Sequence, residues 1–412
     1  TLFPYTTLFR SAGGVCPETD AGYTTLGGLH LLTSITKKID SSHSLTSSFA
    51  YNASNHYVLA SATVDPTGLN LTTGFTFDAI GNLTQVDGPR SDVTDVSDYI
   101  WDANRQLTMA IQPGTVDNGT THPSIAVRTT YDADGQPIQT DKGTTTTATG
   151  SDFTALLSVT TAYDAAGNKV QDTTPTRVTQ YAYDADDRLL CTAERMNPAV
   201  FASLPASACT LGTQGSFGPD RIGETIYDAA GQLRQTVHGL GTPVQQVYET
   251  FKYSLNGKQV AVADADEVST IGVANADALN ANAIAAHQTN FVYDGFDRLI
   301  ETLYADGTGD QITSFDNDSN PLTRMTRAGQ TITSTYDVLD RVASKAVPAV
   351  GAIPANTTTW SYDLAGKVTG LSDTLGNSLS NSYDLAGRLT GETETVPGLS
   401  AKAVSYQYDQ AG

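Results

Sequence analysis

Charged residues are scarce in this chain of 412 residues, and cationic ones are the scarcest. Lys and Arg together number 23 against 44 Asp and Glu, so the formal net charge is −21, and charged residues make up only 16% of the sequence. A nucleic acid is bound mainly by cationic side chains that neutralise its phosphates. The composition therefore predicts no nucleic-acid partner, and it disfavours a polyanionic glycan for the same reason.

Long apolar runs are absent as well. No segment approaches the roughly 18 to 20 consecutive apolar residues that cross a bilayer, so we expect no membrane span. The chain begins without Met and without a basic segment followed by an apolar one, so its start does not predict a signal peptide. Residues 1–11 resemble a translated sequencing adapter, and we expect them to be a non-native tail.

Motifs that carry chemistry are missing too. The chain has six His and three Cys. No two of the His have the spacing of metal ligands on a helix, and the GxSxG, HExxH and Walker A motifs do not occur. We therefore expect no catalytic residues, no metal site and no cofactor, and we interpret the protein as non-enzymatic.

Aromatic residues, by contrast, are frequent, and many of them open a recurring motif: Tyr-Asp-x-x-Gly, then a polar and an apolar residue. The five clearest copies are Tyr131, Asp132 and Gly135; Tyr163, Asp164 and Gly167; Tyr227, Asp228 and Gly231; Tyr362, Asp363 and Gly366; and Tyr383, Asp384 and Gly387. Looser copies begin at Tyr51, Phe77, Trp101, Tyr183, Tyr253, Tyr293, Phe315 and Tyr336, and Tyr408 opens a truncated one. The shortest intervals between copies are 20 to 22 residues, which indicates a repeat array.

The motif predicts a tight turn. Its Asp can accept a hydrogen bond from a backbone N–H two residues on, which starts a type I turn. Three residues after the Asp the chain needs a positive φ, which Gly supplies at no steric cost. Where Gly is replaced we expect the substitute to take the left-handed conformation, which Asn and Asp tolerate best. These substitutes are Asn55, Asn104, Asp187, Asp297, Asp340 and, as the weakest case, Ser319.

The flanks of the motif predict β-strands. In several copies a second aromatic residue stands two positions before the first, as in Phe75 and Phe77 or Trp360 and Tyr362. A spacing of two places both rings on one face of a strand. Each unit is therefore expected to be a hairpin, and because an isolated hairpin is marginal in water, neighbouring units must pair laterally. We predict an all-β fold, a spiralling array of hairpins that forms part of a hollow shell, with under about 10% helix.

On these repeated residues the chain resembles the Rhs/YD-repeat family, which includes bacterial polymorphic toxins, the shell-forming component of insecticidal toxin complexes, and the teneurins. The resemblance covers residues 48–412. It implies a bacterial, secreted or cell-surface protein whose hairpins form a shell around a C-terminal toxin domain. That effector domain and further repeats would be its partners, and neither is found in this sequence, which we expect to be a fragment truncated at both ends.

A second function stays open beside this scaffold: an extracellular adhesion or carbohydrate-binding repeat protein. Exposed aromatic rings can bind a surface glycan, so the repeated Tyr and Trp could form a sugar-binding ladder. The alternative is that the rings pack within the wall, where each buries about 150 to 250 Å². We favour packing, because the repeat accounts for the positions of the rings without any ligand.

Segments outside the repeat divide the chain further. Residues 12–47 carry no convincing copy and are left unassigned, whereas residues 48–412 form the array. Two inserts interrupt it: residues 192–222, which are expected to be mostly loop, and residues 262–290, whose Ala-rich part could form a short helix. The first insert is flanked by Cys191 and Cys209, and both a disulfide and two free thiols remain open for this pair.

Two acidic segments invite a functional interpretation. The run from Asp316 to Asn320 begins like a calcium-binding loop, but Pro321 stands where such a loop needs Gly and Arg327 where it needs Glu. Asp65-Pro66-Thr67-Gly68 resembles the self-cleavage motif of the family, yet it lies outside the expected surroundings. We interpret both as turns.

Overall fold

One antiparallel sheet contains nearly every strand of the protein. The computed structural model describes residues 19–39, 43–55, 57–90, 95–114, 116–117, 120–264 and 288–409. Within them, 29 strands form a single sheet and β9 pairs with β10 in a separate small hairpin. Each strand of the large sheet pairs with the next one along the chain, and β8 continues directly to β11. The result is one uninterrupted meander.

The strands of the first half are short to medium in length. They are β1 (Thr19–Leu26), β2 (Leu29–Lys38), β3 (Ser44–Asn52), β4 (Val58–Val64), β5 (Leu71–Phe77), β6 (Leu83–Asp87), β7 (Val96–Trp101), β8 (Leu107–Ile111), β9 (Val116–Asp117), β10 (Thr120–Thr121), β11 (Ser124–Tyr131), β12 (Pro137–Thr145), β13 (Thr154–Tyr163), β14 (Lys169–Thr173), β15 (Val178–Tyr183) and β16 (Leu189–Arg195).

The second half continues the same pattern. Its strands are β17 (Arg221–Tyr227), β18 (Leu233–His238), β19 (Gln246–Tyr253), β20 (Gln259–Asp264), β21 (Thr289–Tyr293), β22 (Leu299–Leu303), β23 (Gly309–Phe315), β24 (Pro321–Met325), β25 (Thr331–Tyr336), β26 (Val342–Val347), β27 (Asn356–Tyr362), β28 (Val368–Asp373), β29 (Ser378–Tyr383), β30 (Leu389–Thr395) and β31 (Lys402–Ser405).

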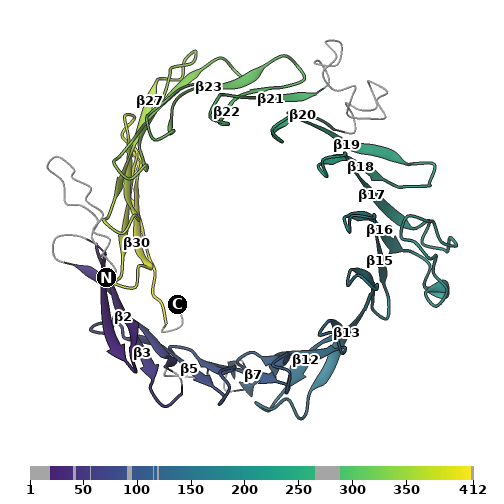
Figure 1. The fold of residues 1–412 in the computed structure, drawn as a ribbon. Helices are drawn as coiled ribbons and strands as arrows, with labels where there is room; N and C mark the ends of the chain where they lie inside the picture. Colours follow the sequence, from purple (N-terminus) through teal and green to yellow (C-terminus); the bar gives the residue numbers. More distant parts are fainter. Residues whose placement is uncertain are drawn as a thin grey trace.

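The sheet curls into a ring around an open centre (Figure 1). The only helical element in the described part of the chain is one 3-10 turn, η1 (Pro198–Val200), which confirms the all-β prediction. No described helix has the length and hydropathy needed to cross a membrane. Where the ring meets itself, β30 lies beside β2, so the array makes slightly more than one coil (Figure 1).

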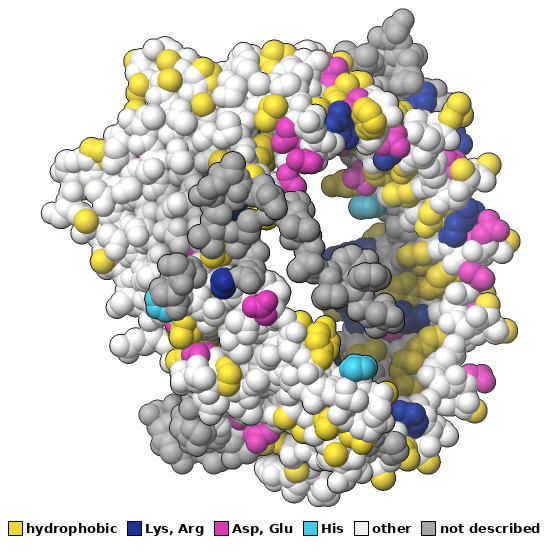
Figure 2. All heavy atoms as spheres, turned by 60° about the vertical axis from the view of Figure 1, so that its left-hand side comes forward, with side chains coloured by type: hydrophobic (Ala, Val, Ile, Leu, Met, Phe, Trp, Pro, Cys, Tyr) yellow, Lys and Arg dark blue, Asp and Glu magenta, His cyan; other side chains and the backbone are white. Residues whose placement is uncertain are grey.

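The two faces of the sheet differ in chemistry. Aromatic pairs such as Tyr181 and Tyr183 lie on one face, while the alternate residues of the same strands, such as Gln180 and Ala182, lie on the other. The loop 196–220 is attached to this second face through Cys191 and lies on the outer side of the ring (Figure 1). The aromatic face is therefore the inner one, and Figure 2 shows hydrophobic side chains gathered on the inner wall.

Two clusters of buried apolar side chains lie where a loop covers the outer face. One cluster contains Cys191, Ala193 and Ile222 beneath Ala208 of the loop 196–220. Another contains Met109, Ile111 and Ala126, which are covered by Phe153 of the loop 146–153. Most other described residues of the wall are only partly buried, so its stability depends on contacts between neighbouring hairpins.

The repeated motif forms the predicted turn. In the copy at Tyr131, the N–H of Gly135 donates to the carbonyl of Asp132 at 3.3 Å. The Asp132 carboxylate accepts from the N–H of Asp134 at 3.0 Å and of Gln136 at 2.8 Å. Gly135 has a φ of +84°, and Tyr131 then pairs with Pro137 across a bulge. We call the five residues that start at the Asp, here 132–136, a Tyr-Asp turn.

The same two carboxylate hydrogen bonds recur in most copies. They are made by Asp78, Asp102, Asp164, Asp184, Asp228, Asp294, Asp316, Asp337 and Asp384. Asp363 accepts from the N–H of Lys367 in the same way.

The prediction of positive φ is right for four of the six substitutes. Asp187, Asp297, Ser319 and Asp340 all have a φ between +59° and +73°. The prediction is wrong for Asn104 and Asn55. In the copy at Trp101 the residue three positions after Asp102 is Arg105, and it takes the left-handed conformation with a φ of +64°; Asn104 stands one position too early in the turn.

In the copy at Tyr51 the turn itself is longer, which explains why Asn55 does not take the left-handed conformation. Tyr51 pairs with Leu59, two positions further on than the spacing from Tyr131 to Pro137. The left-handed conformation therefore falls on Tyr57, with a φ of +57°.

The segments outside the repeat take the following places. Residues 19–38, from the part left unassigned, contribute β1 and β2 to the same sheet. The first insert is narrower than 192–222, because β16 continues to Arg195 and β17 begins at Arg221. The second insert is bounded by β20 and β21, and its residues 265–287, with the Ala-rich part, lie outside the described residues, as do residues 1–11.

Gly81 offers a clean test of the turn. It has a φ of +89°, and an added Cβ would meet nothing within 4 Å. Gly81→Ala should therefore destabilise the β5–β6 hairpin by about 1 kcal/mol through the backbone alone, measured by native-state hydrogen exchange. Gly295→Ala is the control, because Gly295 also has free space but no positive φ; an equal loss in the β21–β22 hairpin would contradict the explanation.

Candidate functional site: the ladder of Tyr-Asp turns and the outer loop

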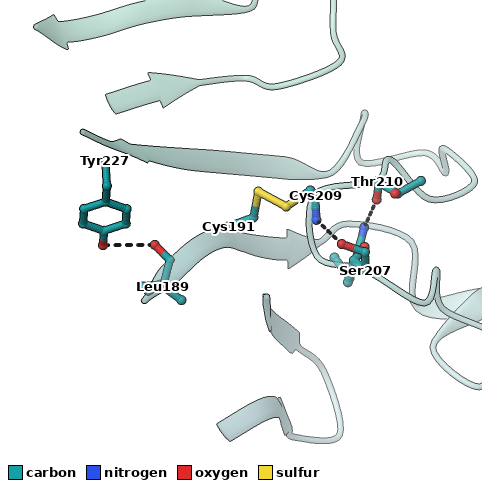
Figure 3. Close-up of a disulfide and its surroundings, with 7 residues drawn as sticks. Leu189, Cys191, Ser207, Cys209, Thr210 and Tyr227 are labelled. Carbon is teal, nitrogen blue, oxygen red and sulfur yellow. Dashed lines mark hydrogen bonds between the residues drawn. A yellow bond between two sulfur atoms is a disulfide. The ribbon is translucent and has the colours of Figure 1, made fainter. Parts of the chain in front are cut away.

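In most copies, the first aromatic residue ties its hairpin to the one before it through a hydrogen bond. The hydroxyl of Tyr227 donates to the carbonyl of Leu189 at 3.2 Å (Figure 3), and Leu189 opens the strand that follows the preceding turn. Equivalent bonds join Tyr131 to Leu107, Tyr163 to Pro137, Tyr183 to Lys169, Tyr293 to Gln259, Tyr336 to Pro321, Tyr362 to Val342, Tyr383 to Val368 and Tyr408 to Leu389. Trp101 makes the same bond to Leu83 through Nε1 at 2.7 Å.

A cation that directly follows the left-handed residue adds a second link. The Arg341 guanidinium pairs with the carboxylate of its own turn, Asp337, at 2.6 Å. It also lies 4.3 Å from the centre of the ring of Tyr362 in the next copy. Such contacts contribute about 0.5 to 1 kcal/mol each at exposed positions. The contact with the ring of the next copy recurs at Arg188 with Tyr227, Lys258 with Tyr293, Arg298 with Phe315, Lys367 with Tyr383 and Arg388 with Tyr408. Of these cations, Arg188, Arg298 and Arg388 also pair with the Asp of their own turn.

Where an amide replaces the cation, it reaches the next turn instead of the ring. Asn168 Nδ2 donates to the carboxylate of Asp187 at 2.8 Å, and Asn320 Nδ2 donates to that of Asp340 at 2.7 Å. Asp187 and Asp340 are left-handed residues of the following copies. An aspartate at this position therefore does more than tolerate a positive φ, because its carboxylate also accepts the cross-turn hydrogen bond.

The pKa values of the turn carboxylates of Asp184 and Asp164 are lowered. A hydrogen bond from the Arg188 side chain is the main cause that lowers the pKa of Asp184 below its ordinary value. In the copy at Tyr163, where no Arg is present, the backbone N–H of Asn168 is the main cause that lowers the pKa of Asp164. Both arrangements favour the charged form that accepts the turn hydrogen bonds.

These contacts bear on the two binding interpretations. Arg341 covers one face of the Tyr362 ring, and the Tyr362 hydroxyl donates to Val342 within the wall. These contacts support the packing interpretation for this residue. The carboxylate of Asp316 likewise accepts from its own turn, at Asp318 and Asn320. Among the described residues, no group of three or more His, Cys, Asp or Glu is arranged to hold a metal ion.

The Asp65 segment forms a turn. The N–H of Gly68 donates to the carbonyl of Asp65 at 3.1 Å, and the carboxylate of Asp65 accepts from the N–H of Leu69 at 2.7 Å. Asp65 has a φ of +49° and is buried. The turn connects β4 to β5 at the end of the sheet opposite to the Tyr-Asp turns.

The outer loop 196–220 is fixed by a disulfide and a buried ion pair. In the structure Cys191 and Cys209 are joined, with their Cα atoms 5.3 Å apart (Figure 3). Arg195 donates to the carboxylate of Asp220 at 2.7 Å and to the carbonyls of Thr210 and Ser207. Both charged side chains are almost fully buried. Sequence reasoning missed this pair, because nothing in the sequence places residues 195 and 220 together.

Asp220 also organises the backbone of the loop. Burial alone would raise its pKa, but hydrogen bonds from the N–H of Met196, from Arg195 and from the N–H of Gly212 outweigh burial and lower it. The carboxylate therefore stays charged opposite Arg195. A buried Arg whose three side-chain nitrogen atoms each donate to an acceptor is compatible with a well-ordered lobe on the outer wall.

Comparisons with known proteins give structural neighbours only. No protein-family model and no curated protein matches the chain. Among solved structures, the chain is similar to the crystal structure of TcdB2-TccC3 at 14% identity and a TM-score of 0.43, over 93% of this chain and 25% of that one. It is also similar to TcdB2-TccC3-Cdc42 at 15% identity and a TM-score of 0.40, over 90% and 20%.

A further neighbour is the Photorhabdus luminescens Tc holotoxin pore, at 14% identity and a TM-score of 0.42, over 90% of this chain and 20% of that one. The chain thus spans about a quarter or less of the length of these structures.

The hydrogen bonds from the Tyr hydroxyls predict that removal of one hydroxyl oxygen measurably lowers the stability of the sheet. Tyr227→Phe keeps the ring but leaves the carbonyl of Leu189 without this donor, so the sheet around β16 and β17 should lose about 1 kcal/mol in native-state hydrogen exchange. Tyr248→Phe is the control, because Tyr248 contacts its neighbour His238 through the ring face. An equal effect of both changes would contradict the role of the hydroxyl.

The disulfide can be tested chemically. In carefully non-reduced protein, alkylation followed by mass spectrometry should leave Cys191 and Cys209 unlabelled. An alkyl label on both cysteines would contradict the disulfide. Reduction should destabilise the outer loop by up to about 3 kcal/mol in the chain-entropy model. Proteolysis within 196–220 should then become faster, while cleavage elsewhere serves as the internal control.

Proposed function

We propose that the protein is a non-enzymatic scaffold, part of a wall that encloses another domain. The observation that carries this proposal is the shape of the sheet: 29 strands in one layer curve around an open centre with hydrophobic side chains on the inner wall (Figures 1 and 2). A single layer of this length has no core of its own to fill its centre. An enclosed volume is therefore what the architecture is suited to provide.

We further propose membership of the Rhs/YD-repeat family. The support is the repeat itself. In copy after copy an Asp starts a turn and a left-handed residue follows three positions later. The aromatic residue before the Asp donates a hydrogen bond to the preceding hairpin. A bacterial, secreted or surface location and a C-terminal toxin domain as cargo follow from this assignment. Further repeats would complete the shell.

The chemistry of the wall favours confinement over catalysis. The charged groups of the ladder are used in turns and between hairpins, as at Asp184 and Arg188, and the buried pair Arg195 and Asp220 serves the outer loop. The net charge of −21 is compatible with a neutral or basic cargo. A wall of this kind would withhold both the active site of its cargo and the space in which the cargo folds.

The deciding experiment is long-read sequencing of the source locus through both ends of this reading frame. We expect further Tyr-Asp repeats, a closing core segment, and a divergent C-terminal domain beside a small immunity-like gene. A frame that continues instead into a surface anchor or other adhesive modules would overturn the encapsulation proposal. A glycan array probed with the purified chain then tests the adhesive function, for which the scaffold predicts no binding.

A further inference from the structure

The place where the ring meets itself contains a repeated contact between two coils. Three Tyr-Asp copies near the C-terminus, those at Tyr362, Tyr383 and Tyr408, lie against the first coil. Their neighbours there are connections at the end of the sheet opposite to the Tyr-Asp turns, which we call the opposite rim: β2 to β3, β4 to β5, and β6 to β7.

The first and third copies each contact one connection, and the second faces the connection between them across a groove. In the first, the N–H of Leu364 donates to the carbonyl of Ile39, after β2, at 3.0 Å. In the second, Leu385 lines a groove of about 620 Å³ together with Leu45 of β3 and with Asp65 and Leu69 of the β4–β5 connection. In the third, Asp409 forms an ion pair at 3.3 Å with Arg90, after β6.

The order of these contacts is regular. One step along the second coil, from one Tyr-Asp copy to the next, corresponds to one step along the first coil, from one connection to the next. Such a one-to-one register arises when both rims have the same spacing of hairpins. The contacts are therefore a property of the repeat, not of one accidental pair of residues.

Solvent exposure distinguishes the turns that lie against the first coil from the other Tyr-Asp turns. The two central residues of the turns that begin at Asp132, Asp164, Asp184, Asp294 and Asp337 are exposed. In the turns that begin at Asp363 and Asp384 the central residues are partly buried. Val338, which occupies the same turn position as Leu364 and Leu385, is 71% exposed. Because the turns share one geometry, the covering coil accounts for the difference.

We propose that the opposite rim is a docking surface for Tyr-Asp turns, engaged one turn per connection, and that its partner is the next coil of Tyr-Asp repeats. This inference rests on the scaffold proposed above and specifies how its coils are joined. Leu at the first variable position of the turn is the anchor, as in Leu364 and Leu385. Connections further along the same rim, at residues 146–153 and 174–177, would receive the turns of further repeats.

The seam between the coils can be opened by substitution in the full chain. Leu364→Asn with Leu385→Asn places amides where the anchors contact the first coil. By hydrogen exchange with mass spectrometry, we expect residues 363–367 and 384–388 to exchange about tenfold faster or more, since seam protection depends on this contact. Small-angle X-ray scattering should show a larger radius of gyration.

The matched control is Val338→Asn with Leu255→Asn, at the same turn position on turns that no coil covers. It should leave the exchange at the seam unchanged. An unchanged seam in the first double variant, or the same acceleration in the control, would overturn the proposal. Exchange in β16 to β18 reports on the folded wall, and if it also rises, Leu364→Ala and Leu385→Ala decide by the same criterion.

A failed seam test leaves the scaffold proposal standing, because that proposal depends on the gene locus and not on these residues. Conversely, a gene locus that encodes adhesive modules would overturn the scaffold proposal, while the contact between the coils could still be measured. The two outcomes are therefore distinguishable.

Discussion

The hydrogen bonds that each turn Asp accepts from its own backbone fix the geometry on which the rest of the wall depends. A carboxylate that accepts from the second and fourth following N–H groups, as Asp132 does, leaves the chain one way to reverse, through a left-handed residue. The residues before and after the turn then stand at fixed places. The Tyr hydroxyl, the cation and the cross-turn amide can reach the neighbouring hairpin only because this reversal is the same in nearly every copy.

A wall of one layer must obtain its stability from contacts between neighbouring hairpins within the layer. In the described part of the chain, two clusters of buried apolar side chains lie under outer loops, as the one around Ile222 does, and most other side chains of the wall are only partly buried. The hydrogen bonds from Tyr residues to the preceding hairpin and the cations that lie over a following ring are individually worth about 1 kcal/mol or less. Their repetition along the array, added to the sheet ladder, links each hairpin to two neighbours, which is the condition for stability in a repeat protein.

Much of the local structure could be predicted from the sequence, because it depends on residues close together in the chain. The turn, the hairpin and the shared face of Tyr181 and Tyr183 all follow from spacing. The errors at Asn55 and Asn104 have the same local origin. One turn is two residues longer than the others, and in the other the fifth position is Arg105, a residue type that rarely takes a positive φ.

What could not be predicted depends on distances between residues far apart in the sequence. The Arg195–Asp220 pair and its loop require the outer face to be known first. The cation after the left-handed residue was visible as a polar position in the motif, but its role needs the ring of the next hairpin. The seam at Ile39 and Leu364 depends on the curvature summed over the intervening strands, a quantity that no single repeat encodes.

That curvature also gives the regular turn a second use. The hydrogen bonds that close a Tyr-Asp turn are made by its backbone and by the Asp carboxylate, as at Asp132, so the side chains of its two central residues are free to vary without damage to the hairpin. Where they face solvent they can be Ala and Asp, as at Ala133 and Asp134. Where the ring overlaps itself they are Leu and Ala. The same turn that ends a hairpin can thus also join one coil to another, and the spacing that pairs the strands sets the register between the coils.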